Sequence, residues 1–146
     1  MTFFRRLPLI VGAIAMFGAC SASSGPANNL DVNVSGAAFE RIGTPAIASV
    51  PFSVVNRGSA SEFVARCGVR VMAALDRWNG QSWIQYSGDA CIAIYTTAAL
   101  EVAPGASIAA SRSVPDAGRY RLRLGAADVA TGGFDWSIVS RDFEVR

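Results

Sequence analysis

The side chains that most often carry enzyme chemistry are nearly absent from this chain. It has no histidine, and all 13 of its basic residues are arginine. Without histidine there are no His-based triads, Cys–His pairs or most catalytic zinc sites, and without lysine there is no Schiff-base or Ser–Lys chemistry. The acidic residues are scattered singly, mostly beside turns, where carboxylates bond the local backbone. We therefore expect a protein that is not an enzyme and that holds no cofactor or metal.

Two cysteines, Cys67 and Cys91, could form either a structural disulfide or a reactive pair. An even pair in an exported chain favours the disulfide. A bridge enclosing about 25 residues would stabilise the fold by roughly 3–4 kcal/mol in the chain-entropy model. The alternative is a redox-active or metal-binding pair, but C-x-x-C spacing and a second ligand cluster are both missing. We predict a structural Cys67–Cys91 disulfide.

Three arginines alternate with apolar residues late in the chain. Arg119, Arg121 and Arg123 are separated by Tyr120 and Leu122, which is the two-residue period of a half-buried strand. On the outward face of that strand they could bind an anionic polymer, such as an envelope polysaccharide, or an acidic protein patch. The alternative is a solvated face on which the arginines pair with neighbouring acids.

A pair of tryptophans brackets a hairpin signal. Trp78 precedes Asn79-Gly80, and Trp83 and Tyr86 follow it. Asn-Gly is the strongest short signal for a hairpin, because a type I′ turn needs positive φ at both central residues. Exposed aromatic residues anchor interfaces, so Trp78 and Trp83 are candidate binding residues. Packing in the core is their alternative role.

A long Gly-rich loop, residues 125–136, carries two more aromatic residues, Phe134 and Trp136. Binding sites on rigid scaffolds are usually placed on loops, so both residues join the candidate binding surface. Asp128 and Asp135 lie in the same loop, but their spacing does not match a known calcium loop.

The N-terminal segment has the order of a secretory signal peptide. Arg5 and Arg6 precede an apolar run of 13 residues, Leu7–Ala19, which ends at Cys20. As a helix this run spans about 20 Å, too short for the roughly 30 Å of a bilayer core. The ending Phe17–Cys20 resembles the lipobox of bacterial lipoproteins, which implies cleavage before Cys20 and attachment to membrane lipid through Cys20. Cleavage without lipidation, giving a soluble secreted protein, is the alternative.

The rest of the chain divides into a tether and one domain. Residues 20–29 are rich in Ser, Ala, Gly, Pro and Asn and carry no charge, which is typical of a flexible linker. Residues 30–146 are long enough for one domain. Because Arg5 and Arg6 leave with residues 1–19, eleven arginines remain to balance eleven acidic residues. Such a domain is not expected to bind nucleic acid.

Short β-runs separated by Gly, Pro, Asn and Asp fill residues 30–146. Alternation of apolar and other residues is seen at 32–34, 52–55, 69–76 and 119–124, and the last strand is expected over about 137–145. The nearest approach to a helical segment is the short Ala-rich stretch at 97–99. About seven to nine strands at this spacing predict an all-β fold, an antiparallel β-sandwich.

One motif sharpens the fold prediction. Asp116, Gly118 and Tyr120 form the pattern D-x-G-x-Y, the tyrosine corner of immunoglobulin-like folds, in which the Tyr hydroxyl bonds back to the backbone. With the Trp78–Trp83 hairpin and the Pro104-Gly105 turn, the motif makes the chain resemble bacterial immunoglobulin-like domains of small envelope lipoproteins. The resemblance implies an immunoglobulin-like sandwich that serves as a structural or binding module.

The chain departs from antibody-type domains at Leu122, where these domains place a cysteine two residues after the corner tyrosine. The Cys67–Cys91 bridge is therefore expected to staple the base of the Trp78–Trp83 hairpin instead of joining the sheets in the usual way.

The expected protein is lipid-anchored in the bacterial cell envelope and faces the periplasm or the cell surface. Its domain would bind an envelope protein or polysaccharide, or serve a structural role. One alternative is a small envelope inhibitor of a protease or lysozyme that acts through a protruding loop. Another is an accessory subunit of an envelope assembly.

Overall fold

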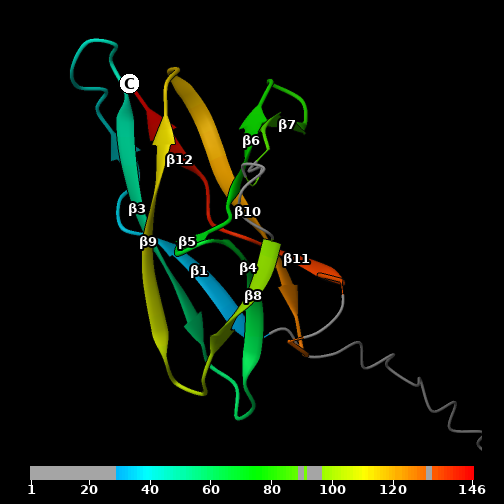
Figure 1. Ribbon diagram of the computed structural model, residues 1–146. Coiled ribbons are helices and arrows are strands. Elements are labelled where there is room, and N and C mark those ends of the chain that lie inside the picture. Colours follow the sequence, from blue (N-terminus) through cyan, green and yellow to red (C-terminus); the bar gives the residue numbers. More distant parts are fainter. Residues whose placement is uncertain (1–28, 89–90, 92–96, 131–132) are drawn as a thin grey trace, which may run out of the picture.

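Two β-sheets packed against each other form the described part of the chain. The computed structural model describes residues 29–88, 91, 97–130 and 133–146, and these residues form strands and no helix. Figure 1 shows β3 and β9 on one side and β4, β8, β10 and β11 on the other. The strands are β1 (Leu30–Val34), β2 (Ala38–Phe39), β3 (Ala48–Asn56), β4 (Glu62–Cys67), β5 (Arg70–Val71), β6 (Ala74–Trp78), β7 (Trp83–Ser87), β8 (Thr97–Val102), β9 (Ser107–Val114), β10 (Gly118–Ala127), β11 (Trp136–Val139) and β12 (Phe143–Val145). This is the β-sandwich that the alternation predicts.

The smaller sheet has the order β1-β3-β9, and both pairs are antiparallel. Along its central strand β3, Val50, Phe52 and Val54 are buried, while the residues between them are more exposed. Successive side chains of a strand point to opposite faces, so this alternation gives the sheet one apolar inner face.

The larger sheet is built around β10. One edge of β10 pairs with β12 at residues 118–120 and with β11 at 123–126. The other edge pairs with β6 at 120–123 and with β4 at 126–127. β7 extends the sheet beyond β6, β8 and β5 pair with β4, and β2 joins β12 in a parallel pair. Because β10 has strands along both edges, its outward-pointing side chains lie in the middle of the outer face of this sheet.

The hydrophobic core lies between the inner faces of the two sheets. Tyr120, Leu122 and Leu124 of β10 are fully buried and belong to one apolar cluster with Val50 and Val54 of β3. Burial of an apolar side chain of this size contributes about 1.5–3 kcal/mol. The core therefore holds β10 rigidly from its inner side.

The tyrosine corner is formed at the start of β10. The Tyr120 hydroxyl donates a hydrogen bond of 3.1 Å to the carbonyl oxygen of Asp116. Gly118 has a φ of 155°, a backbone conformation that residues with a side chain rarely adopt, so glycine is favoured at this position. One sheet has the order β1-β3-β9. In the other sheet, β10 has β4 and β6 along one edge and the C-terminal strands β11 and β12 along the other. This arrangement is that of an immunoglobulin-like sandwich.

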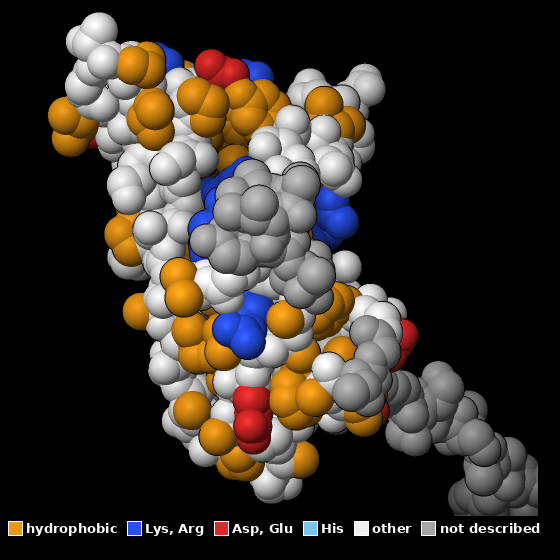
Figure 2. Space-filling model, viewed as in Figure 1, with side chains coloured by type: hydrophobic (Ala, Val, Ile, Leu, Met, Phe, Trp, Pro, Cys, Tyr) orange, Lys and Arg blue, Asp and Glu red, His pale blue; other side chains and the backbone are white. Residues whose placement is uncertain are grey.

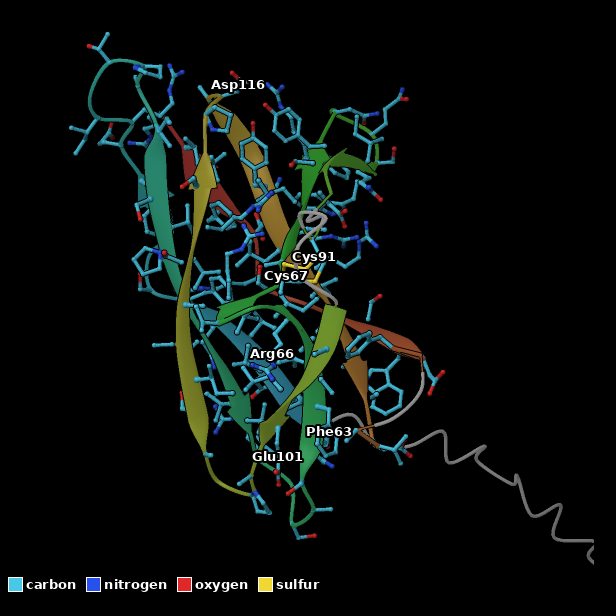
Figure 3. All side chains as sticks on the ribbon, in the orientation of Figure 1. Phe63, Arg66, Cys67, Cys91, Glu101 and Asp116 are labelled. Carbon is cyan, nitrogen blue, oxygen red and sulfur yellow. A yellow bond between two sulfur atoms is a disulfide. The ribbon has the colours of Figure 1, made fainter. Side chains whose placement is uncertain are left out.

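The predicted Cys67–Cys91 disulfide is present. The Cα atoms are 5.4 Å apart, within the usual range for a disulfide. Cys67 is the last residue of β4, and Figure 3 shows the yellow S–S bond joining it to the segment that follows β7. The bridge ties the exit of the β6–β7 hairpin to β4, as expected from the sequence.

The prediction of one strand over residues 69–76 is wrong. Gly68, with a φ of 59°, turns the chain between β4 and β5, and Val69 in this turn is 99% exposed. The strand β4 was not predicted, because two adjacent residues, Val64 and Ala65, are both buried in it and break the alternation.

Two further expectations about strands differ from the structure. The last strand is not continuous over 137–145, because the Ser140 side chain interrupts it: the Leu122 N–H donates to Ser140 Oγ at 2.9 Å. The result is two strands, β11 and β12. The Ala-rich residues 97–99 belong to strand β8. With these breaks the described residues form twelve strands, several of them short, instead of seven to nine.

The hairpin at Asn79-Gly80 is present, but its turn is not type I′. Trp78 pairs with Trp83, so the loop has four residues. Positive φ occurs at Gly80 (99°) and, among the described residues, at no residue other than glycine. The Asn79 Oδ1 accepts hydrogen bonds of 2.9 Å from the N–H groups of both Gln81 and Ser82. The asparagine therefore closes the turn with its side chain.

The predicted signal peptide, Cys20 and the predicted tether up to residue 28 lie outside the described residues.

Candidate functional site

The arginine row occupies the outward face of β10. Tyr120, Leu122 and Leu124 point into the core, so the alternating Arg119, Arg121 and Arg123 lie on the opposite face. Their guanidinium groups lie in the middle of the outer surface of the larger sheet. In Figure 2, a basic side chain is visible at the edge of the molecule below the β6–β7 hairpin, and another lies lower down, at the place that Figure 3 labels Arg66.

Each arginine of the row has an acidic partner. Arg121 Nε and Arg123 Nε donate to the two carboxylate oxygens of Asp76, at 3.2 and 3.1 Å. Arg119 Nε donates to Asp142 Oδ2 at 2.6 Å. This hydrogen bond is the main reason why the pKa of Asp142 lies below its ordinary value. The row is thus the ion-paired face that the sequence left as the alternative, and it is not a block of unpaired positive charge.

Asp76 is the shared, buried carboxylate that holds Arg121 and Arg123 of the row in place. It lies opposite Arg121 in the β6–β10 register and is only 4% exposed. Gln85, opposite Asp76 on β7, accepts a hydrogen bond of 2.9 Å from Arg123 Nη2. Sequence reasoning missed both residues, because the parity of a strand indicates which face a side chain occupies but not which strand lies beside it.

Trp78 and Trp83 stand opposite each other on the same outer face. Their ring centroids are 5.4 Å apart and the planes are tilted by 57°. Both side chains are half-buried, and neither belongs to the core cluster. The alternative that the two tryptophans pack in the core is therefore wrong.

The tryptophans and the arginines form one surface. Arg121 Cζ lies 4.8 Å from the centroid of Trp83. Arg119 Cζ lies 5.9 Å from the centroid of Trp78 and 5.8 Å from that of Trp83. Such cation–π contacts contribute about 0.5–1 kcal/mol at exposed sites and restrain the rings. We call the set Trp78, Trp83, Arg119, Arg121 and Arg123 the Trp–Arg face.

A cleft adjoins the Trp–Arg face at Arg119. Its volume is about 390 Å³, and it lies between the ends of β2, β10 and β12. Besides Arg119, its charged lining residues are Asp142, Glu144 and Arg146. Arg146 Nη2 donates to Glu144 Oε2 at 2.9 Å. The cleft therefore presents hydrogen-bond donors and acceptors side by side.

Tyr86 does not join the exposed aromatic residues. Its ring packs edge-on against Tyr120 at 5.4 Å, and its hydroxyl donates to the carboxylate of Asp116. That hydrogen bond, helped by burial, raises the pKa of Tyr86 to about 12. Figure 3 shows Asp116 at the end of the sandwich that the β6–β7 hairpin also reaches. Tyr86 thus braces the hairpin against the tyrosine corner.

The two loop aromatics are separated from each other by the sheet. Trp136 begins β11 opposite the buried Ala126 and packs against the core as a partly buried side chain, so it does not belong to the Trp–Arg face. Phe134 lies over the backbone of β10, where a Cβ added at Gly125 would be 3.0 Å from the Phe134 Cβ. Gly125 has the same parity as the arginine row, so Phe134 lies on the outer face beyond Arg123.

The described residues contain neither a cluster of metal-ligating side chains nor a membrane-spanning helix. Within them, no group of three or more Cys, Asp or Glu side chains is placed to hold a metal ion. They also contain no helix long and apolar enough to cross a membrane.

Comparison with known proteins identifies no relative by sequence. No protein-family model matches the chain, and no curated protein matches it. Among solved structures, the chain is similar to a β-glucosidase from Listeria innocua in complex with glucose, at 12% sequence identity and a TM-score of 0.34. The match covers 80% of this chain and 16% of that chain. At this level the likeness says nothing about what this chain binds or catalyses.

Proposed function

We propose that the chain is a lipid-anchored bacterial lipoprotein whose non-enzymatic immunoglobulin-like domain binds a component of the cell envelope. The anchor is supported by the order of residues 5–20, in which a positive pair, a short apolar run and a cysteine follow one another. A lipoprotein carries at least two acyl chains, and two chains make membrane attachment stable. The neutral tether would then let the domain reach its partner near the membrane.

The observation that carries the binding proposal is the restraint of Trp78 and Trp83 on an outer sheet face by Arg119 and Arg121. Trp and Arg are the residues most enriched at binding hot spots. Side chains that are already ordered lose less conformational entropy when a partner binds. A rigid sheet with such a pair is suited to binding.

The anchor is tested by measuring the intact mass of the chain recovered from the membrane fraction, for the wild type and for Cys20→Ser. Added acyl mass on the wild type alone supports the anchor. An unlipidated, soluble wild-type chain would remove it.

The binding face is tested by sedimentation of the detergent-extracted full chain with washed cell-envelope fragments. Trp83→Ala should weaken co-sedimentation. The matched control is Ile84→Ala, because Ile84 is the next residue of β7 and is 47% exposed but alternates away from Trp83. Equal co-sedimentation of both variants and the wild type would exclude the Trp–Arg face as the binding surface.

A protruding loop favours the inhibitor as a second candidate function. Ile42 is 78% exposed, and reciprocal backbone hydrogen bonds of 3.1 Å between Ile42 and Ile47 close the loop. Arg41 Nη1 donates to the Pro115 carbonyl at 3.0 Å and braces its base. The measurement is the residual activity of a panel of proteases and of lysozyme with the chain in excess. Inhibition that Ile42→Asp abolishes would support this candidate, and full activity of every enzyme would remove it.

A further inference from the structure

A row of side chains crosses five strands on the outer face of the larger sheet. Trp83 of β7 stands beside Trp78 of β6, which lies next to Arg119 of β10. In the strand register, Arg119 lies opposite Glu144 of β12, and Glu144 lies opposite Ala38 of β2. Neighbouring strands are about 4.8 Å apart, so the row is about 19 Å long. We call these five residues the cross-strand row.

One end of the cross-strand row offers flat apolar rings. Trp78 and Trp83 are partly exposed, and Arg119 restrains both rings. A pyranose ring has one face of C–H groups with partial positive charge, which fits the negative face of an aromatic ring. Stacking of the two also removes apolar area from water. The tryptophan end is therefore a platform for a sugar ring.

The other end of the row offers paired donors and acceptors. The cleft beside Arg119 is lined by Asp142, Glu144 and Arg146, and their side chains remain 43%, 55% and 63% exposed. Carboxylates accept hydrogen bonds, guanidinium groups donate them, and a sugar hydroxyl does both. Adjacent hydroxyls of one sugar can thus bridge an arginine and its carboxylate partner.

The charges on this part of the sheet favour an uncharged ligand. Arg119 and Arg146 are balanced by Asp142 and Glu144, so a polyanion would meet two carboxylates along the same path. A protein partner fits less well, because the charged Arg119 and Arg121 lie against the tryptophan rings, whereas large exposed apolar patches mark sites for protein partners.

We propose that the cross-strand row binds an uncharged oligosaccharide, with one pyranose ring stacked on the tryptophans and the next units in the cleft at Arg119. The inference rests on the proposed function, since it names the ligand class of the same face. It extends the binding surface to Asp142, Glu144 and Arg146, and it replaces the anionic polymer suggested by the arginine row.

The test is a titration of the detergent-extracted full chain with chitohexaose, cellohexaose and, as the polyanion, oligogalacturonate. Two of the three tryptophans in the chain lie in the row, so intrinsic fluorescence reports on binding, and calorimetry gives the affinity. We expect saturable binding of at least one neutral hexasaccharide, weakened about tenfold by Trp83→Ala. Trp83→Phe should restore part of the affinity, Glu144→Gln should weaken binding less, and Ile84→Ala should leave it unchanged.

The inference is overturned if neither neutral hexasaccharide binds at millimolar concentration, or if oligogalacturonate alone binds. It is also overturned if a folded Trp83→Ala variant binds like the wild type. Thermal unfolding of each variant shows that it is folded. If the sugars fail while Trp83→Ala still weakens co-sedimentation with envelope fragments, the proposed function survives and the oligosaccharide does not. The face would then bind an envelope protein.

Discussion

Replacing Asp76 with alanine would leave two guanidinium groups without the carboxylate that they share. The Asp76 side chain is 6% exposed, whereas those of Arg121 and Arg123 are 28% and 33% exposed. Removing one partner of a fully buried pair costs about 3–5 kcal/mol, and removing one from an exposed pair costs about 0.2–1 kcal/mol. Because burial here is intermediate, we expect Asp76→Ala to lower the free energy of unfolding by about 2–3 kcal/mol.

The assay is thermal unfolding followed by circular dichroism. For a domain of this size each kcal/mol lowers Tm by about 3–5 °C, so the expected drop is about 10 °C. Tryptophan fluorescence of the folded variant should also change, because Arg121, one of the two arginines released, contacts Trp83.

Asp142→Ala is the matched control, since it removes a carboxylate from the same face. Asp142 and its partner Arg119 are 43% and 50% exposed, so the expected loss is below about 1 kcal/mol. Equal Tm shifts for the two variants, or no shift for Asp76→Ala, would refute the argument that burial decides the value of these carboxylates.

Three further outcomes are expected. Loss of the Cys67–Cys91 disulfide by paired Ser substitution should lower the free energy of unfolding by about 3–4 kcal/mol, measured by urea unfolding; an unchanged midpoint would contradict this. Tyr120→Phe removes the hydrogen bond to the Asp116 carbonyl and should cost about 1 kcal/mol in the same assay. Tyr86 has a pKa of about 12, above the ordinary 10.0, so its contribution to stability is complete below pH 10 and is lost as the pH rises toward 12. An absorbance titration should show Tyr86 ionising late, together with Tyr120, whose pKa is raised chiefly by burial. Asp116→Asn should bring the ionisation of Tyr86 to lower pH.

The fold was predictable where local pattern and local chemistry agree. Tyr120, Leu122 and Leu124 alternate strictly and are buried, as the two-residue period requires. The motif around Asp116 forms the hydrogen bond that its pattern predicts. Prediction failed where one residue overrides the pattern: Gly68 turns the chain beside an apparently apolar position, Val69.

The candidate site was predictable only as separate pieces. The parity of β10 places Arg119 and Arg121 outward, and the spacing of Trp78 and Trp83 predicts a hairpin. That these pieces meet depends on the β6–β10 register, which pairs Arg121 with Asp76, 45 residues earlier in the chain. No local pattern contains that pairing, so the buried carboxylate that aligns the arginines was not foreseen.

The central place of β10 has a consequence for the order of folding. Four strands, β4, β6, β11 and β12, pair with it directly, and it spans residues 118–127 of 146. Contacts between distant parts of the sequence form slowly, because the intervening loop must be closed first. The larger sheet therefore cannot be completed until the last fifth of the chain has emerged. Until then the edges of β4 and β6 that pair with β10 are open, and open strand edges make an incomplete sheet prone to aggregation.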